Sequence, residues 1–330
     1  MPGTRALEGR VVDPLDGERF ARVEIENETI VSVTPIDADS ESGYIFPGFI
    51  DVHVYDESET AANGVTGYLL TCGTAPPEQV AAFLRDRGTD PTCLGVHLEG
   101  PFINADAAGA QPVEHVQPVD LELLESWLDS DRVRLITLAP EVEGGLDAIR
   151  RIAESPAVAG LGHTRANYYT TKAAIELGAR FATHIWNAMS GFTARTPGAI
   201  GTLLADERVT LGLIPDGRHL HPVTEQLTLQ IAGPGRIAAT SDLVPPPHER
   251  PEDGKLLGGD RLGAALVRRL ANHGLEAAAT MTSLTPARLL DLDDRGRIAP
   301  GYRADLALLD SDFEPLETIA AGTSIWRAAE

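Results

Sequence analysis

The sequence has few lysines, few cysteines and no long apolar run, and each shortage excludes a class of protein. Only two of its 27 basic residues are lysines, Lys172 and Lys255, against 49 acidic residues, and the formal net charge is -22. A phosphate backbone needs a basic surface, so nucleic acid is excluded as a partner. No apolar stretch reaches the roughly 18 residues of a membrane span, and the first residues lack the apolar core of a secretion signal. We therefore expect a cytoplasmic protein that does not enter a membrane.

The cysteines and the acidic residues indicate the kind of environment the chain is built for. Cys72 and Cys93 both lie in apolar, β-like runs, and they are too few for a disulfide scaffold or a thiolate cluster. We expect both in the core. Acidic residues spread along the whole chain are typical of a halophilic surface, because high salt screens their mutual repulsion. An ordinary acidic cytosolic enzyme is the alternative.

Short β-branched runs alternate with helical patterns through most of the chain. Eight such strands can be counted, beginning with FIDVHV, and the connection at residues 56–64 is too short for a helix. Eight units in about 250 residues predict an α/β fold, a (β/α)8 TIM-like barrel over residues 47–296. An open doubly wound sheet is the alternative, but no glycine-rich phosphate motif follows the first strand.

The two ends of the chain have a different pattern. Residues 9–35 and 296–310 alternate apolar and polar side chains with turn signals between them, as antiparallel strands do. We expect residues 1–46 and 297–330 to pair into one small β-sandwich domain beside the barrel.

Ionisable side chains gather at the predicted carboxyl ends of the barrel strands, where such barrels place catalytic groups. They are His97, Glu99, His163, His184, Asp216, His219 and Asp242. A buried carboxylate such as Glu99 needs a partner, and no lysine or arginine lies at a neighbouring strand end. Two imidazoles and one carboxylate with an open fourth position are the pattern of a catalytic zinc site. For any one histidine, a hydrogen-bonded core residue is the alternative.

Asp242 follows a strand that is otherwise small and apolar. An acid at this position can take a proton from a metal-activated water and return it to a leaving group. Because a proline turn follows, a capping role is the alternative.

Several motifs together carry a resemblance to a known family. They are FPGFIDVHV, GVHLEGPFIN, GHTRAN, THIWNAMSGF, IPDGRHLHP and TSDL. In this order they resemble the N-acetylglucosamine-6-phosphate deacetylase family of the amidohydrolase superfamily, and HLEGPF and THxxNAM are specific to that branch. The resemblance covers nearly the whole chain. It implies a metal-dependent hydrolase that converts N-acetyl-D-glucosamine 6-phosphate to D-glucosamine 6-phosphate and acetate.

The resemblance also implies roles for individual residues. One divalent ion per subunit, Zn²⁺ or alternatively Fe²⁺, would be bound by Glu99, His163 and His184. Asp242 would be the general base and acid. The amino-sugar phosphate would be held by Asn187, the Ala188 backbone, Arg195 and His219, with Arg195 reaching across a homodimer. Two alternatives stay open, since Arg195 could be a surface ion-pair partner and His219 could cap the helix that begins near Pro222.

The sequence departs from the family at two positions, Tyr55 and Gln111. Many relatives carry two histidines on the first strand and bind a second metal there, whereas this chain has His53 and Tyr55, and a neutral tyrosine is a poor ligand. We therefore expect one tightly bound metal. His53 would contact the ligands of this metal without binding it, or would be a residue left from a lost second metal site. A histidine that helps polarise the acetyl carbonyl is replaced by Gln111, which donates a hydrogen bond but no charge. Two alternatives to this function stay open. The chain could be an amidohydrolase that acts on another N-acyl sugar or on a cyclic amide, or it could be a scaffold without turnover.

Overall fold

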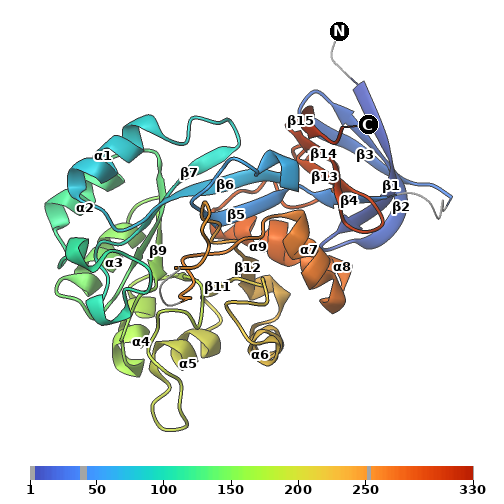
Figure 1. Cartoon of the computed structure of the whole chain (residues 1–330). Coiled ribbons are helices and arrows are strands. Elements are labelled where there is room, and N and C mark those ends of the chain that lie inside the picture. The colour runs from blue at the N-terminus through green and yellow to red at the C-terminus, as the bar shows by residue number, and fades with distance from the viewer. Residues whose placement is uncertain (1–3, 38–42, 251–253, 330) are drawn as a thin grey trace.

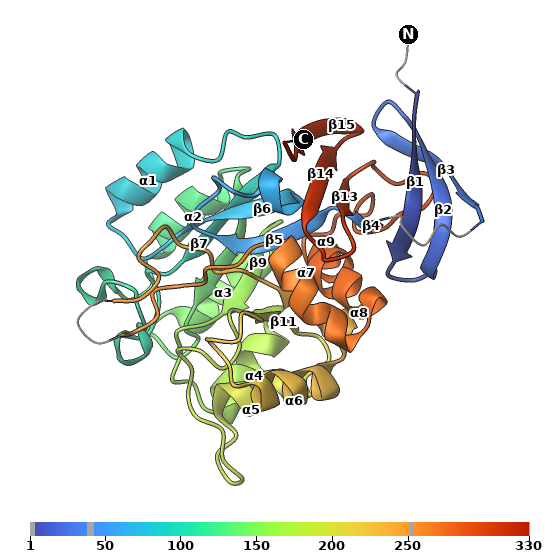
Figure 2. The same ribbon diagram turned by 45° about the vertical axis from the view of Figure 1, so that its right-hand side comes forward.

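The structure is a computed structural model of the whole chain, and it describes residues 4–37, 43–250 and 254–329. Its larger part is a sheet of eight parallel strands in which each strand is bonded to the next along the chain (Figures 1 and 2). The strands are β5 (Phe49–Val54), β6 (Val65–Cys72), β7 (Cys93–Glu99), β8 (Val133–Leu138), β9 (Val158–Leu161), β10 (Phe181–Ala182), β11 (Thr210–Leu213) and β12 (Ile237–Ala239).

The sheet closes just beyond the ends of its first and last strands. The Asp242 amide donates to the His53 carbonyl at 2.9 Å, and the Tyr55 amide donates to the Leu243 carbonyl at 2.9 Å. Closure of eight parallel strands produces a barrel, so the predicted (β/α)8 fold is confirmed.

Helices connect the strands in chain order and cover the outside of the barrel (Figure 1). They are α1 (Pro77–Asp86), α2 (Leu121–Leu128), α3 (Gly145–Ala153), α4 (Tyr168–Glu176), α5 (Gly198–Ala205), α6 (Pro222–Ala232), α7 (Ala264–Leu270), α8 (Leu275–Ala279) and α9 (Thr285–Leu289). Between β5 and β6 the chain makes only a short 3-10 turn, η1 (Ala61–Asn63), so the predicted lack of a helix there is confirmed. None of the helices among the described residues is long and apolar enough to cross a bilayer.

The helices form where apolar side chains recur on one face. In α3 the side chains of Ala148, Ile149 and Ile152 are buried, whereas Arg150 and Arg151 face solvent. A side chain fixes the start of other helices, because Asn167 accepts a hydrogen bond from the Thr170 amide at 3.0 Å before α4.

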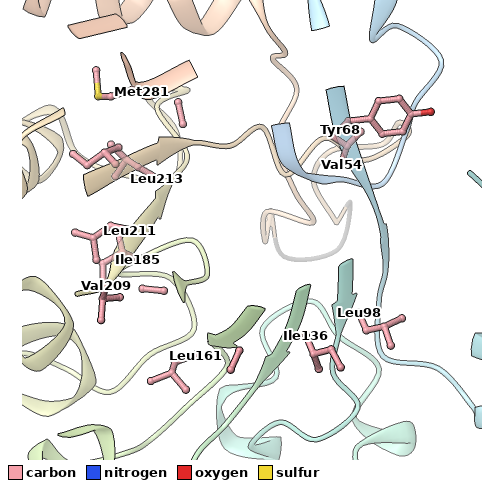
Figure 3. Packing of buried hydrophobic residues seen from close by; sticks show 14 of the residues in the cluster. Val54, Tyr68, Leu98, Ile136, Leu161, Ile185, Val209, Leu211, Leu213 and Met281 are labelled. Carbon is pink, nitrogen blue, oxygen red and sulfur yellow. The ribbon is translucent and has the colours of Figure 1, made fainter. Parts of the chain in front are cut away.

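Two apolar clusters hold the barrel together. The larger one joins the outer face of the strands to the helices, and Figure 3 shows its members Leu98, Ile136 and Leu161 on three neighbouring strands. The second combines strand residues such as Leu135 and Phe181 with residues of α9. Phe181, Leu135 and their neighbours therefore form a layer closed off by α9, away from the strand ends that carry the ionisable groups. Cys72 is buried and Cys93 is half-buried, and both are free thiols.

The two ends of the chain build a second sheet of seven strands. They are β1 (Thr4–Asp13), β2 (Gly17–Glu26), β3 (Thr29–Pro35), β4 (Tyr44–Pro47), β13 (Leu306–Leu309), β14 (Pro315–Ala320) and β15 (Thr323–Arg327). The strand order is β15-β14-β13-β4-β1-β2-β3, so β4 and β13 join the two ends of the chain. Ile30 of β3 and Ile319 of β14 share one buried cluster although they lie toward opposite edges. The sheet therefore curves over a single core, which agrees with the predicted small β domain built from both ends of the chain.

A glycine makes the passage from the small sheet to the barrel possible. Gly48 lies between β4 and β5, and a Cβ at this position would lie 2.1 Å from Thr66 Oγ1. Any larger side chain would push β6 away from the start of β5.

Candidate metal centre and active site

The ionisable side chains stand at the carboxyl ends of the strands on unusual backbone. Glu99 is the last residue of β7, and His163, His184 and Asp242 follow β9, β10 and β12. The last three have positive φ angles of 48°, 32° and 50°. A left-handed backbone is unfavourable for residues other than glycine, and such conformations cluster at functional sites because they aim side chains that a regular strand would not.

Glu99, His163 and His184 converge on one point inside the barrel mouth. The Nε2 atoms of His163 and His184 lie 3.1 Å and 2.9 Å from Glu99 Oε1, and 3.1 Å from each other. All three residues are buried, and their ligand atoms lie within 4.8 Å of one another. Burial would raise the pKa of Glu99, but the positive charge of the neighbouring His53 holds it well below its usual range. Glu99 is thus an anion.

The hydrogen bonds of these residues fit a bound cation. His163 Nδ1 lies 2.9 Å from the Ala107 carbonyl oxygen, which can only accept, so Nδ1 carries the hydrogen. In the neutral ring the lone pair of Nε2 then faces both a carboxylate oxygen and the Nε2 atom of His184. Three electron-rich atoms so close together repel one another unless a positive charge lies between them. A divalent ion would supply that charge, and a ligating histidine with its other nitrogen on a carbonyl is the usual arrangement.

Tyr55 and Gln111 hold the second oxygen of Glu99. The Tyr55 hydroxyl donates to Glu99 Oε2, and Gln111 Nε2 donates to the same oxygen at 2.6 Å and to the Tyr55 hydroxyl at 2.9 Å. Gln111 Oε1 in turn accepts from the Thr74 amide at 2.8 Å. Burial and the charge of Glu99 raise the pKa of Tyr55 well above its usual value, so the phenol keeps its proton. The amide of Gln111 is occupied by Glu99 and Tyr55, so it does not extend freely into the pocket.

His53 is fully buried behind this group, within the irregular part of the β5–β6 pairing between Asp51 and Val54. Its Nε2 atom lies 3.2 Å from Asp242 Oδ1 and 3.4 Å from Glu99 Oε2. Burial alone would lower the pKa of His53, but the two carboxylates raise it to about 9. In this arrangement His53 is a positive charge between Glu99 and Asp242.

Asp242 is buried at the edge of the same cavity, and burial raises its pKa while His53 opposes that shift. The capping role considered for Asp242 falls to its neighbour Ser241, because the Leu243 amide donates to Ser241 Oγ at 3.2 Å. The carboxylate of Asp242 is therefore available for proton transfer.

The cavity over these groups has a volume of about 280 Å³. It is lined by Tyr55, Glu99, Gly109, Ala110, Gln111, His163, His184, Asn187, Ala188, His219, Asp242, Lys255, Leu256, Leu257 and Gly258. Four of the expected substrate contacts are among them, namely Gln111, Asn187, Ala188 and His219.

His219 and Arg195, both expected to bind the substrate, differ in their positions relative to the cavity. His219 Nδ1 lies 2.7 Å from Asp216 Oδ2, which orients its ring, and α6 is capped by His221 rather than by His219. Burial would raise the pKa of Asp216, but its hydrogen bonds with His219 lower it to about 2. Arg195 is exposed on the loop before α5 and is absent from the lining of the cavity of its own chain.

Two features of the site were not expected from the sequence. His97 lies below the cavity and not in it, with Nδ1 3.1 Å from the Val52 carbonyl oxygen and Nε2 2.7 Å from Thr137 Oγ1. Lys255 does line the cavity. Its only signal in the sequence is its rarity, as one of two lysines, within a proline- and glycine-rich loop.

Comparison with known proteins agrees with this geometry. The sequence profile described as Amidohydrolase family matches residues 141–321. The N-acetylglucosamine-6-phosphate deacetylase of Bacillus subtilis is 30% identical, over 84% of this chain and 83% of the relative. The N-acetylgalactosamine-6-phosphate deacetylase of Escherichia coli is 32% identical, over 85% of this chain and 86% of the relative.

Solved structures extend the similarity to the whole fold. The N-acetylglucosamine-6-phosphate deacetylase of Thermotoga maritima has a TM-score of 0.90 and 28% identity, over 98% of this chain and 100% of that one. A mutant of the Mycobacterium smegmatis N-acetyl-D-glucosamine-6-phosphate deacetylase, in complex with N-acetyl-D-glucosamine-6-phosphate, also has a TM-score of 0.90, with 27% identity over 98% of this chain and 99% of that one.

Proposed function

The chain belongs to the amidohydrolase family, and we propose that it hydrolyses N-acetyl-D-glucosamine 6-phosphate to D-glucosamine 6-phosphate and acetate. The observation that carries this proposal is the convergence of Glu99, His163 and His184 beside Asp242 in one cavity. Relatives of 28–30% identity that carry this activity in their names support the choice of substrate.

Glu99, His163 and His184 would hold one divalent ion, for which we propose Zn²⁺ with Fe²⁺ as the alternative. Two imidazole nitrogens and one carboxylate oxygen are a donor set that suits zinc. When bound, such an ion polarises the acetamide carbonyl and brings the pKa of a water ligand to about 7.

Asp242 performs the proton transfers of this reaction. Its carboxylate takes a proton from the attacking water and returns it to the amine nitrogen that leaves. His53, at 3.2 Å, keeps the side chain in place and stabilises the carboxylate before the first transfer and after the second, whereas between the two transfers the acid is neutral. Tyr55 and Gln111 fix the orientation of Glu99.

Asn187, Ala188 and His219 line the cavity and would contact the sugar phosphate. Acetate release by the purified protein tests the function, with the phosphorylated and free forms of N-acetylglucosamine and with N-acetylgalactosamine 6-phosphate as substrates. Relatives of 32% identity are named for the galactosamine compound, so that sugar is the second candidate. A protein that binds metal but releases acetate from none of these compounds would contradict the proposal.

We also propose that the active protein is a homodimer in which Arg195 reaches the cavity of the other subunit. The loop that carries Arg195 projects from the body near α5 (Figure 2), and Phe192 on the same loop exposes its ring. On the neighbouring α6, Val223, Leu227 and Ile231 form an exposed apolar stripe that a second subunit could cover.

Mixed dimers test this arrangement. Arg195→Ala and Asp242→Asn chains, each inactive alone, should regain activity when they are unfolded together and refolded, because one cavity then has both residues. If Arg195 acts within its own chain, the mixture stays inactive. Ultracentrifugation of each sample gives the oligomeric state.

We further propose a cytoplasmic location, which the charge of the substrate supports, and adaptation to high salt, which the acidic composition supports. A charged sugar phosphate is costly to move through a bilayer, so its hydrolase would act where the compound is made. Thermal unfolding measured from low to high KCl tests the second proposal, because screening should raise the midpoint of an acidic halophilic protein.

A further inference from the structure

A phosphorylated substrate brings about two negative charges into a cavity whose floor is already acidic. Glu99 and Asp242 both line that floor. Among the described residues that line the cavity, Lys255 is the one lysine or arginine. Arg195 lies outside the lining within the same chain. Lys255 therefore carries a positive charge that a single chain can offer to the phosphate.

The ammonium group of Lys255 lies beside the expected sugar-phosphate contacts. Its Nζ atom donates a hydrogen bond to the Gly109 carbonyl oxygen, across the mouth of the cavity. A Cβ on Gly109 would lie 3.3 Å from His163 Cε1 and 3.6 Å from Ala188 Cβ. Gly109 thus belongs to the wall formed by Ala188 and His163, and Lys255 places its charge at that wall.

Backbone bonds join the described residues before and after positions 251–253 in the segment that carries Lys255. Glu249 and Leu256 form an antiparallel bridge, and the Arg250 amide donates to the Lys255 carbonyl oxygen at 2.8 Å. The Leu257 amide donates to the His248 carbonyl oxygen at 2.9 Å. These bonds fix the direction in which the Lys255 side chain leaves the loop.

The base of the loop is attached to the catalytic acid. The Gly259 amide donates to the Asp242 carbonyl oxygen at 2.7 Å. Arg218, from the segment that also carries His219, bonds to Glu249 and, at 2.7 Å, to Asp260. The loop therefore links Asp242 at its base to Lys255, and its ion pairs with Arg218 hold it against the His219 side of the cavity.

We propose that Lys255 binds the 6-phosphate group and so selects phosphorylated amino sugars. This inference rests on the proposed function. In the complex the ammonium exchanges its bond with the Gly109 carbonyl for bonds with phosphate oxygens, while Asp242 remains at the acetamide. An ammonium is a compact point charge with three donors, which suits a phosphate that other groups have already positioned.

Lys255→Met and Lys255→Arg test the proposal in the full chain. The control is Lys172→Met, which removes the other lysine, a half-buried residue of α4 paired with Asp206 and Glu176. The measurement is kcat/KM for N-acetylglucosamine 6-phosphate divided by kcat/KM for N-acetylglucosamine. We expect Lys255→Met to lower this ratio about 10- to 100-fold, because one charge-assisted hydrogen bond is lost. The change should be mainly in KM. Lys255→Arg should restore most of the ratio, and Lys172→Met should leave it unchanged.

Binding separates this inference from the proposed function. Calorimetry with D-glucosamine 6-phosphate and with D-glucosamine measures the phosphate contribution even if the chain releases no acetate. Weaker binding of only the phosphorylated sugar by Lys255→Met supports the inference in either case. An unchanged ratio and unchanged binding, or equal losses for both sugars, would overturn the inference. The bond from Lys255 to Gly109 would then serve to hold the loop in place.

Discussion

Replacement of Tyr55 by phenylalanine removes one hydroxyl from the network behind the metal site. That hydroxyl donates to Glu99 Oε2 and accepts from Gln111 Nε2 at 2.9 Å. The variant keeps the ring and its packing, and Gln111 still donates to Glu99 at 2.6 Å. One of the two side-chain donors that orient the carboxylate is therefore lost without opening a cavity.

The expected size of the effect follows from the charge on Glu99. A hydrogen bond to a charged group contributes about 1.5–3 kcal/mol, which corresponds to roughly a 10- to 100-fold change in a binding constant. Groups that orient a metal ligand have effects of about 10- to 100-fold on metal affinity. We therefore expect the Kd for Zn²⁺ to rise at least about 10-fold in Tyr55→Phe.

Competition with a chelator measures the Kd, and a matched control is Tyr169→Phe, since Tyr169 is 80% exposed on α4. Gln111→Ala and the double variant complete a cycle. Because Gln111 bonds to both partners, the double variant should lose less than the sum of the single losses, with a coupling of about 0.5–3 kcal/mol. Zinc affinity that is unchanged in Tyr55→Phe would refute the idea that this network positions Glu99.

Three further predictions concern the ion, the acid and the small domain. Asp242→Asn should keep the metal and lose turnover by about 100-fold or more, whereas His184→Ala should lose both, as metal analysis and acetate release will show. Removal of the metal by a chelator should lower the thermal midpoint, because a ligand at 100 times its Kd stabilises the native state by about 2.7 kcal/mol. Burial would raise the pKa of Glu317, but its bonds with Arg5 and Arg327 lower it to about 2. The stability that wild type has over Glu317→Gln should thus be present above pH 4.5 and vanish as the pH falls to about 2, in urea titrations at several pH values.

The barrel could be predicted because its signals are local. Each strand and helix carries its own apolar period, and eight alternations within this length leave few other folds. The manner of closure could not be predicted, since β10 and β12 have only two and three residues and the backbone of Asp242 and Leu243 makes the last bonds to β5. These bonds depend on where loops pack, which no local pattern encodes.

The candidate site likewise has features that local sequence patterns predict and features that they do not. The positions of Glu99, His163, His184 and Asp242 follow from their places after strands. The direction of Gln111 does not, because its amide turns to Glu99 and Tyr55 through a bond with the Thr74 amide from a distant loop. Lys255 was missed for the same reason, since its loop returns to the cavity only through tertiary contacts.

The left-handed backbone at three site residues explains why the chain keeps strain where regular strands would be more stable. His163, His184 and Asp242 each have a positive φ, at a cost of about 1–3 kcal/mol for a residue that is not glycine. Neighbouring backbone bonds enforce the strained turns, as between the Thr164 amide and the Ala188 carbonyl oxygen at 3.0 Å. A glycine would relieve the strain but remove the side chain that the strain directs to the cavity. Stability and activity are therefore opposed at these positions, and they are poor targets for stabilising the protein.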